Sequence, residues 1–427
     1  MNEYVAVLDL GTSKMLALAV SMENRSNIIA SAQVESGNAM KRGIIADETE
    51  FKTKINELLE NFQAKLPAPL TKIYIGLGGQ GLHSETRTST MPNEGEVIEQ
   101  PTLSAMEEDF SQQSLEWPVD LLDMYAAIPE YYLDGELEDE PIGKTAQRIE
   151  GHYFCIVGHQ QEMKEILDNT LRAAGIDVVD YFISPLATAA SALSIQEKQA
   201  GCALVEMGAT LSYLSIYSDG KLCYLQTLPL GGDAITGDLC TLDKNLTTAD
   251  AEKKKITEGK AFALENDSEA IKWIEARMLE ILSNLKALIQ QSGYADQLEA
   301  GIVLTGGASQ LRQIDQLWAT LSKLKMRLIS DRPEQSCALG MAKLGKELCG
   351  QVKQSAPVEK EPEKEPEIEP VATDETEQKN GIGANFAKWI TKKDKSAGKN
   401  KNKEDKKDKN SGMKDLFSGF AEKILND

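Results

Sequence analysis

A short polar turn near the start of the chain carries residue types that suit a phosphate and a divalent cation. It reads Asp9-Leu10-Gly11-Thr12-Ser13-Lys14 and lies between two apolar runs. Gly11 lets the backbone approach a ligand closely, and the hydroxyls of Thr12 and Ser13 add donors to the backbone amides of the turn. A carboxylate such as Asp9 suits hydrated Mg²⁺, which keeps waters and takes few protein ligands. An ordinary hairpin turn is the alternative, because so short a motif is weak without context.

A second polar turn has the same setting further along the chain. It reads Glu206-Met207-Gly208-Ala209-Thr210, again between two apolar runs, and the unit ends at Gly231-Gly232. Its small residues would also expose backbone amides to a phosphate. Glu206 places a carboxylate at this turn, as Asp9 does at the first one. Two strand hairpins that open on a polar turn indicate an internal duplication of supersecondary structure.

Two further segments have residues that suit the rest of a nucleotide. In Leu304-Thr305-Gly306-Gly307-Ala308 the glycines would let a base or ribose lie against the backbone, with a helix N-terminus nearby. In 251–261, which contains Gly259, Glu252 and Lys255 are three residues apart and share one helix face, where an acceptor and a cation can hold a ribose and base. A common strand–helix turn and a solvated charged helix are the respective alternatives.

The elements that would position these residues follow from hydrophobic periodicity, which predicts a mixed α/β fold. Near-continuous apolar runs predict buried strands over 4–11, 14–21, 71–79, 178–185, two arms within 201–232, and 300–304. Helical periods cover 160–175, 186–193, 251–261 and 269–293, with a further helix after the Gly306-Gly307 turn. The apolar stripe of the longest helix comprises Ile271, Ile274, Met278, Ile281, Leu282, Leu285, Leu288 and Ile289.

Composition excludes several classes of protein. The formal net charge of −21 over 427 residues argues against general nucleic-acid binding, which requires Lys and Arg at the phosphates. Six scattered Cys without a C-x-x-C pair, and only three His, favour reduced buried thiols over a metal site. The N-terminus lacks the basic region of a signal peptide, and no stretch approaches the ~20 apolar residues of a spanning helix. We therefore expect a cytoplasmic protein.

The composition changes near residue 350. Residues 351–412 are first acidic and Pro-rich, then Lys-rich, and are expected to form a disordered linker. Residues 413–427 return to a helical period, and at ~1.5 Å per residue this helix is too short to span a bilayer, so we expect it to lie in the membrane interface. Docking on the protein itself or on a partner groove is the alternative. The apolar face comprises Met413, Leu416, Phe417, Phe420, Ala421, Ile424 and Leu425.

A shorter apolar stripe precedes the Lys-rich block. It comprises Ile382, Phe386, Trp389 and Ile390, and Gly residues interrupt it. An auxiliary contact with a membrane or partner and an unstructured patch are both open.

The order of these motifs resembles that of the actin and heat-shock-chaperone ATPase superfamily. Within it the chain is most similar to the FtsA family of bacterial cell-division proteins, over roughly residues 1–350. Stretches that carry the likeness include "VAVLDLGTSKMLALAV", "SGNAMKRGII", "IYIGLGGQGLHSE", "AEKKKITEGKA", "EAGIVLTGGASQL" and "SCALGMAKLGKEL". The resemblance implies an actin-like two-domain fold with duplicated sheet-and-helix domains, an FtsA-type extra subdomain, and a disordered C-terminal linker ending in an amphipathic helix. It divides the chain into domain 1 (1–79 and 166–198), the extra subdomain (80–165), domain 2 (199–350, with a small subdomain at 245–298), the linker (351–412) and the membrane-targeting helix (413–427).

The resemblance also implies a function. A protein of this kind binds ATP with Mg²⁺, polymerises with itself, and anchors filaments of the tubulin-like protein FtsZ, with other division proteins, to the cytoplasmic face of the cell membrane at the division site. Asp9 would hold the metal, and Glu206 would be the candidate catalytic residue. The nucleotide would contact the two turns, the Gly231-Gly232 pair, Glu252, Lys255, Gly259 and the segment Gly306-Gly307-Ala308.

The second turn departs from the family pattern, which is Asp-x-Gly-x-Gly-Thr. Here Glu206 stands for the Asp, Thr210 for a Gly and Leu211 for the Thr, and Tyr213 takes the place of a later Asp. Positioning governs phosphoryl transfer, so we expect nucleotide binding with at most slow hydrolysis. The segment between Ala261 and Leu298 is also shorter than the family pattern, in the subdomain expected to touch FtsZ.

Three other functions share this fold. A small-molecule kinase would need a catalytic base beyond the phosphate turns and has no use for the amphipathic C-terminal segment. A chaperone would need a substrate domain where the linker is expected. A pilus-assembly-type actin-like membrane adaptor is the remaining alternative.

Overall fold

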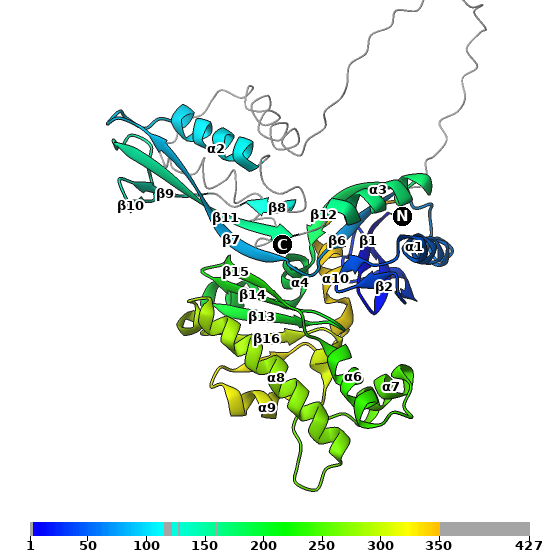
Figure 1. Cartoon of the computed structure of the whole chain (residues 1–427). Helices are drawn as coiled ribbons and strands as arrows, with labels where there is room; N and C mark the ends of the chain where they lie inside the picture. The colour runs from blue at the N-terminus through cyan, green and yellow to red at the C-terminus, as the bar shows by residue number, and fades with distance from the viewer. Residues whose placement is uncertain (1–2, 115–121, 127–128, 159–160, 351–427) are drawn as a thin grey trace, which may run out of the picture.

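The computed structural model describes residues 3–114, 122–126, 129–158 and 161–350, which form two main sheets. The first has five strands, and its antiparallel hairpin continues into parallel neighbours. In spatial order the strands are β12 (Asp177–Ile183), β6 (Lys72–Leu77), β1 (Tyr4–Leu10), β2 (Lys14–Ser21) and β3 (Ile28–Glu35). Strands β1, β2, β6 and β12 of this sheet lie together in Figure 1. A small separate pair joins β4 (Met40–Lys41) to β5 (Ile44–Ile45).

The second sheet is longer because two sets of strands join in it. One end consists of β17 (Met326–Leu328), β16 (Gly301–Thr305), β13 (Cys202–Met207), β14 (Ser212–Ser218) and β15 (Lys221–Leu228). It continues into β7 (His83–Pro92), β11 (Arg148–Gly158), β9 (Glu130–Leu133) and β10 (Glu136–Glu138), with β8 (Leu122–Ala126) paired to β11. The link is narrow, because β15 and β7 pair in register only at Gln226 and His83.

The strand order confirms the predicted duplication. Read from one side, the first sheet runs β12-β6-β1-β2-β3 and the matching part of the second runs β17-β16-β13-β14-β15. In each case an antiparallel hairpin lies beside a parallel strand. The near-continuous apolar runs form these hairpins because β1, β2 and β13 are buried along almost their whole length.

Helices cover the sheets and bury an apolar stripe against them. They are α1 (Glu48–Gln63), α2 (Gln100–Ser114), α3 (Gln161–Ala173), α4 (Ser184–Ala192), α5 (Ile195–Ala200), α6 (Gly232–Leu242), α7 (Thr248–Glu258), α8 (Glu269–Gln291), α9 (Ile314–Leu321) and α10 (Ser336–Leu344). Three short 3₁₀ helices cover Ala295–Gln297, Gly307–Gln310 and Pro333–Gln335. Most of the predicted stripe of α8 is confirmed, since Ile274, Met278 and Leu285 are buried in the core of the second sheet. Ile271 and Leu288 are only partly buried. None of the helices in the described ranges is long and apolar enough to cross a membrane.

Helices α4 and α10 tie the two halves together. Each follows the outermost parallel strand of its own sheet, and the two cross at Gly340 and Ala187 (Figure 1). A Cβ on Gly340 would lie 1.7 Å from the carbonyl O of Ala187, so only glycine allows this approach. Ser191 Oγ also donates to the Ser336 carbonyl O at 2.6 Å. Since Ala338 and Met341 of α10 belong to the core of the first sheet, α10 spans both halves.

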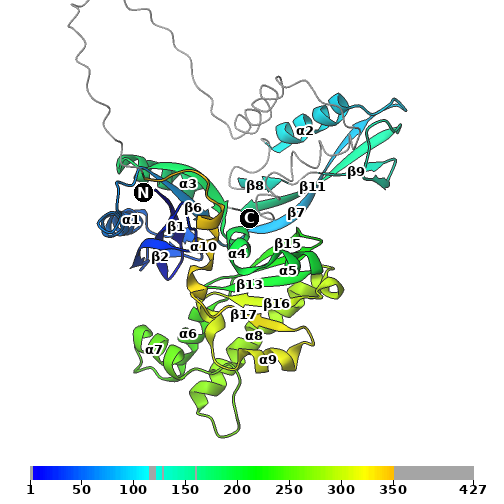
Figure 2. The ribbon, with the colours of Figure 1, turned by 180° about the vertical axis from the view of Figure 1, so that it is seen from behind.

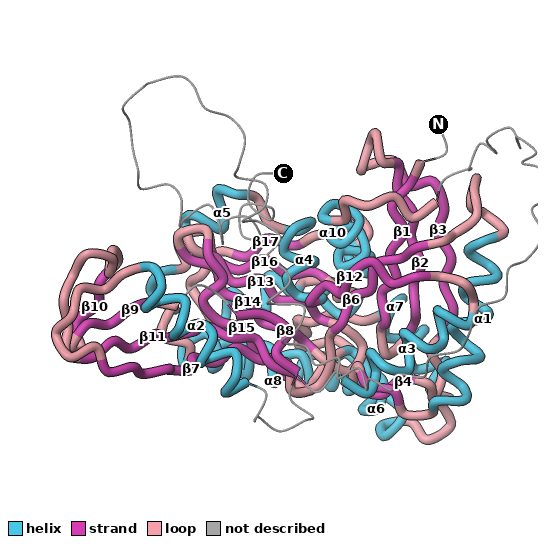
Figure 3. The backbone as a smooth tube through the Cα atoms, turned by 90° about the horizontal axis from the view of Figure 1, so that it is seen from above, coloured by secondary structure: helices cyan, strands magenta, loops and turns pink. Residues whose placement is uncertain are grey.

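Strands β7 to β11 and helix α2 form what we call the third lobe. It projects from the rest of the molecule, on the side away from β1–β3, in both ribbon views (Figures 1 and 2). Seen from above, β9 and β10 lie at its outer end (Figure 3). The third lobe is therefore continuous in sheet pairing with the second sheet although it interrupts the sequence of the first.

Most predicted elements are confirmed, with one correction. The helix expected directly after Gly306-Gly307 is instead the 3₁₀ turn Gly307–Gln310, and the following α-helix begins only at Ile314. Gln313 lies between the two helices and interrupts them, because it adopts the left-handed conformation with φ of 64°. All six Cys are free thiols, four of them buried. The expected linker, the 382–390 stripe and the 413–427 helix lie outside the described residues.

Candidate nucleotide site between the two hairpins

The first turn is a tight loop whose backbone is fixed by hydrogen bonds within the turn and from Ser36. The N–H of Gly11 donates to the Lys14 carbonyl O at 3.0 Å, which closes the turn between β1 and β2. Ser36, just after β3, donates from Oγ to the Gly11 carbonyl O at 2.7 Å and from its N–H to the Ser13 carbonyl O at 3.0 Å. These bonds fix the backbone, so the turn is preorganised before any ligand arrives.

The second turn repeats this geometry, and the two turns touch. The N–H of Gly208 donates to the Leu211 carbonyl O at 2.8 Å, at the position that corresponds to Gly11 and Lys14. Thr210 Oγ1 donates to Thr12 Oγ1 at 3.0 Å across the space between the halves. The same Thr12 oxygen accepts from the Gly43 N–H at 3.2 Å. The structure thus brings together two turns that lie about 200 residues apart.

Asp9 and Glu206 occupy equivalent ends of β1 and β13 and act on each other electrostatically. Burial raises the pKa of Asp9 to about 6, although a hydrogen bond with the Cys337 thiol and the charge of Lys14 lower it. Burial raises the pKa of Glu206 to about 8, and the negative charge of Asp9 adds to this. A hydrogen bond from Thr188 Oγ1 at 2.7 Å acts in the opposite direction. At neutral pH Glu206 therefore keeps its proton.

Two glycine pairs, Gly231-Gly232 and Gly306-Gly307, lie beside the second turn. The N–H of Gly232, at the start of α6, donates to the Gly208 carbonyl O at 3.0 Å, and Gly231 precedes it. Gly306 has φ of 89°, and a Cβ there would lie 2.4 Å from the Met207 carbonyl O, so this turn requires glycine. A Cβ on the neighbouring Gly307 would meet open space.

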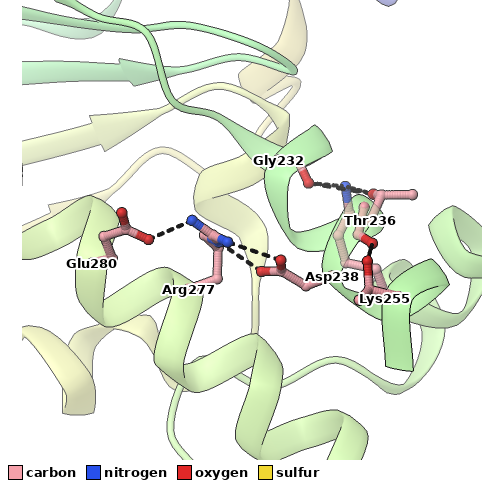
Figure 4. Close-up of polar contacts among 8 residues, drawn as sticks. Gly232, Thr236, Asp238, Lys255, Arg277 and Glu280 are labelled. Carbon is pink, nitrogen blue, oxygen red and sulfur yellow. Dashed lines mark hydrogen bonds and ion pairs between the residues drawn. The ribbon is translucent and has the colours of Figure 1, made fainter. Parts of the chain in front are cut away.

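Glu252 and Lys255 form the predicted pair on one face of α7, but the ammonium is already occupied. Lys255 Nζ lies 2.6 Å from Glu252 Oε2 and donates to the Gly232 carbonyl O and to Thr236 Oγ1, each at 3.0 Å (Figure 4). Thr236 Oγ1 also donates to Glu252. An ammonium has three hydrogens, so Lys255 anchors α7 to α6. The Glu252 side chain is 39% exposed and is the member of the pair that a ligand could reach.

Gly259 and Ala308 complete the predicted set. The N–H of Gly259 donates to the Lys255 carbonyl O at 3.0 Å and so ends α7. Ala308 lies beside Gly232, where an added Cβ would be 3.2 Å from the Ala308 Cβ. All predicted site residues in the described chain therefore gather around the two turns and the elements that hold the second one.

Several contacts at this site were not predicted from the sequence. Tyr213, the residue paired with Glu206 across β13 and β14, accepts a 2.6 Å hydrogen bond from the Gly79 N–H in the other half. Thr188 of α4 and Cys337 of α10 contact the carboxylates of Glu206 and Asp9. The sequences around Thr188 and Cys337 are typical of ordinary apolar helices, so these two contacts become visible only in the tertiary structure.

The two carboxylates suit a hydrated divalent cation. Mg²⁺ needs one or two carboxylates and keeps waters, and a cation nearby would favour the ionised form of both Asp9 and Glu206. Among the described residues, no group of three or more His, Cys, Asp or Glu side chains is arranged around a common centre. Two open cavities, of about 470 and 560 Å³, lie elsewhere, beside Tyr181 of β12 and beside Leu137 of β10.

Comparison with known proteins gives a consistent result. The family model for cell division protein FtsA matches residues 203–340, which include the second turn and the Gly306 turn. FtsA of Neisseria meningitidis is 26% identical, covering 91% of this chain and 98% of its own length. FtsA of Porphyromonas gingivalis is 28% identical over 73% of this chain and 69% of its own, and FtsA of Bacillus subtilis 28% over 77% and 79%. The resemblance to FtsA is confirmed.

Among solved structures, the chain is similar to one titled "PilM-PilN type IV pilus biogenesis complex". The TM-score is 0.57 at 17% identity, covering 79% of this chain and 97% of that one. At such identity the likeness concerns the fold alone. Together with the duplicated sheets, it confirms the actin-like fold class for the described part of the chain.

Proposed function

We propose that this protein binds ATP with Mg²⁺ between its two hairpins, polymerises, and anchors FtsZ filaments to the cytoplasmic face of the cell membrane at the division site. The observation that carries the proposal is the meeting of two matched turns, Thr12 against Thr210, with Asp9 and Glu206 at their bases. The similarity to FtsA proteins over most of the chain supports the division role.

In this proposal each turn has a defined task. Backbone amides of 11–14 and 208–211 would hold the phosphates, and Asp9 would hold the hydrated Mg²⁺. The open side of Gly307 and the exposed carboxylate of Glu252 would border the adenosine. Lys255 would act by keeping Glu252 and Gly232 in place, since its three hydrogens are already donated.

Hydrolysis would be slow at most because the second turn is poorly equipped for it. Leu211 offers no hydroxyl, and Thr210 is engaged with Thr12. Glu206 is protonated at neutral pH, so it is a poor general base until a cation ionises it. Tyr213 takes the position of the family's later Asp and is held by Gly79. Steady-state phosphate release above about 1 s⁻¹ that is lost in Glu206→Ala would contradict this part of the proposal.

Attachment to the membrane would come from the amphipathic segment 413–427. A single short apolar helix binds lipid weakly and reversibly, so polymerisation would supply the avidity by aligning many copies. The 351–412 linker would let each helix reach the bilayer. Nearby lysines would add attraction to anionic lipid, about 1 kcal/mol for each cation close to the surface.

The other functions of this fold have less support. The likeness to the pilus complex is one of fold, and the curated relatives named above are all FtsA proteins. A kinase would require a catalytic base that is not already used. In this proposal Asp9 holds the metal, and the pKa of Glu206, raised to about 8, keeps its carboxyl group largely protonated at neutral pH.

Co-sedimentation tests the proposal. The full chain, with Mg-ATP, should pellet with liposomes of anionic phospholipid and should carry FtsZ filaments with it. A chain that ends at residue 412 should bind FtsZ but leave the liposomes in the supernatant. If the full chain pellets neither FtsZ nor liposomes, the proposed role is wrong.

A further inference from the structure

The third lobe ends in a groove whose surroundings are unusually acidic. Residues 80–158 contain 17 acidic and three basic residues, so this part of the chain accounts for much of the net charge of −21. At the outer end, eight acidic residues lie within 94–99 and 134–140. Most of them are exposed. Such a surface attracts a cationic partner and repels an anionic membrane.

The groove itself runs beside a free strand edge. β10 pairs with β9 and is the terminal strand of the sheet in the described part of the chain. An open cavity of about 560 Å³ lies between β10 and the loop 143–145, with Glu136, Leu137 and Glu138 on the strand side. Its volume is in the range of ligand-binding sites, and a free edge can pair with an extended peptide.

Exposed apolar side chains lie in the groove and near it. Leu137 is 55% exposed, Val97 55% and Ile142 47%. Backbone pairing brings the last two to the same place, because Val97 is bridged to Thr145 and Ile98 bonds with Lys144. Lys144 Nζ lies 3.3 Å from Glu138 Oε2, so an acidic side chain of this groove already pairs with a lysine. The groove therefore suits a segment with apolar residues followed by cations.

One segment of this chain has that composition. Residues 382–409 begin with the stripe Ile382, Phe386, Trp389 and Ile390 and contain ten lysines against four acidic residues. The 31 residues that connect it to Gly350 extend to about 100 Å, against a radius of gyration of about 20 Å for a compact body of 350 residues. The segment can therefore reach the third lobe of its own chain.

We propose that residues 382–409 dock in the β10 groove of the same molecule. The aromatic residues Phe386 and Trp389 pack against Leu137, and the lysines that follow pair with Glu136, Asp139 and Glu140. Docking holds the lysines away from any anionic surface, so the contact is autoinhibitory. This inference stands apart from nucleotide and FtsZ binding, because it uses neither.

Carbodiimide cross-linking of the full chain tests it, since this reagent joins only amines and carboxylates already in contact. An equal mixture of ¹⁴N- and ¹⁵N-labelled protein is cross-linked in 50 mM and in 500 mM salt and analysed by mass spectrometry. We expect bonds between lysines of 392–409 and Glu136, Asp139 or Glu140, within one isotope label, that fall at least fivefold in high salt.

Two matched variants separate groove binding from loose attraction. Leu137→Ser removes the apolar contact and leaves every cross-linkable carboxylate in place, so those bonds should fall at least fivefold. Leu264→Ser changes an equally exposed leucine, 56% exposed, in another part of the molecule and should leave them unchanged. Cross-links unaffected by Leu137→Ser, or spread evenly over acidic surfaces, would overturn the proposal. Cross-links between the two isotope labels would show that a second copy is the occupant, which also overturns it.

Discussion

Replacing Glu206 by Gln should stabilise the ligand-free protein, and more so as the pH rises. Burial and the charge of Asp9 raise the pKa of Glu206 from 4.5 to about 8. A carboxyl group whose pKa is higher in the folded state binds its proton more tightly there. Its favourable contribution is complete below pH 4.5 and is lost as the pH rises to about 8. Gln cannot ionise, and its amide oxygen can still accept from Thr188, so the variant avoids this loss.

The size of the effect follows from the pKa shift. At about 1.4 kcal/mol for each pKa unit, a rise from 4.5 to about 8 sets an upper limit of about 5 kcal/mol. The Glu206 side chain is only partly buried, and solvent reduces the effect, so we expect about 2 kcal/mol between pH 5 and pH 9. In domains of 150–250 residues this corresponds to a difference in Tm of at least about 4 °C.

Thermal unfolding of wild type and Glu206→Gln at pH 5, 7 and 9, without nucleotide, measures this pH-dependent difference in Tm. The matched control is Glu197→Gln, because the pKa of Glu197 is lowered in the folded protein, whereas that of Glu206 is raised. Burial acts to raise the pKa of Glu197, but hydrogen bonds from the Ser194 backbone and Arg327 outweigh it and lower the pKa. Its contribution to stability is therefore present at pH 7 and 9, and the Gln variant should be less stable at both. A Tm difference between wild type and Glu206→Gln that is constant from pH 5 to 9 would refute the reasoning.

Four further outcomes are expected. Asp9→Asn should weaken ATP binding at least tenfold in a fluorescent-nucleotide titration with Mg²⁺ but change it little in EDTA, because only the metal contact is lost. Thr12→Val should lower the free energy of unfolding by about 1 kcal/mol in urea, since it removes the bond to Thr210; an unchanged midpoint would argue against that contact. Mg-ATP binding at pH 7 should release protons, seen by calorimetry in two buffers of different ionisation enthalpy, because a cation beside Glu206 lowers its pKa from about 8. Phe420→Glu should abolish flotation with liposomes and leave ATP affinity unchanged, and persistent flotation would exclude 413–427 as the membrane contact.

The backbone of the site could be predicted from the sequence because its signals are local. Apolar runs interrupted by Gly and polar residues locate both hairpins, and Glu252 and Lys255 lie together because they are three residues apart on one helix. The occupied state of the Lys255 ammonium could not be predicted, because its other partners, Gly232 and Thr236, come from α6.

Contacts between residues far apart in the sequence could not be predicted either, because the two partners belong to different elements. Tyr213 meets Gly79 134 residues away, and β7 joins the second sheet through the single register pair of Gln226 and His83. No periodicity encodes such pairings, since they depend on how complete elements pack. The 3₁₀ turn after Gly306 was missed because Gln313, a residue without a turn signature, adopts the left-handed conformation there.

The two hairpins have the same backbone geometry, but their acidic residues differ in pKa. The first turn keeps an acid with pKa about 6 beside Lys14, so Asp9 is largely ionised at neutral pH and ready for a cation. The second keeps an acid with pKa about 8, so at neutral pH Glu206 is largely protonated, and a cation beside it would favour its ionised form. In the proposed complex, the cation held by the first half would therefore also interact with Glu206 on β13 of the second half. The contact of Thr12 with Thr210 joins the same two halves. Under the proposed function, a nucleotide bound at this site would hold the two halves together, which would favour a ligand-dependent assembly over rapid turnover.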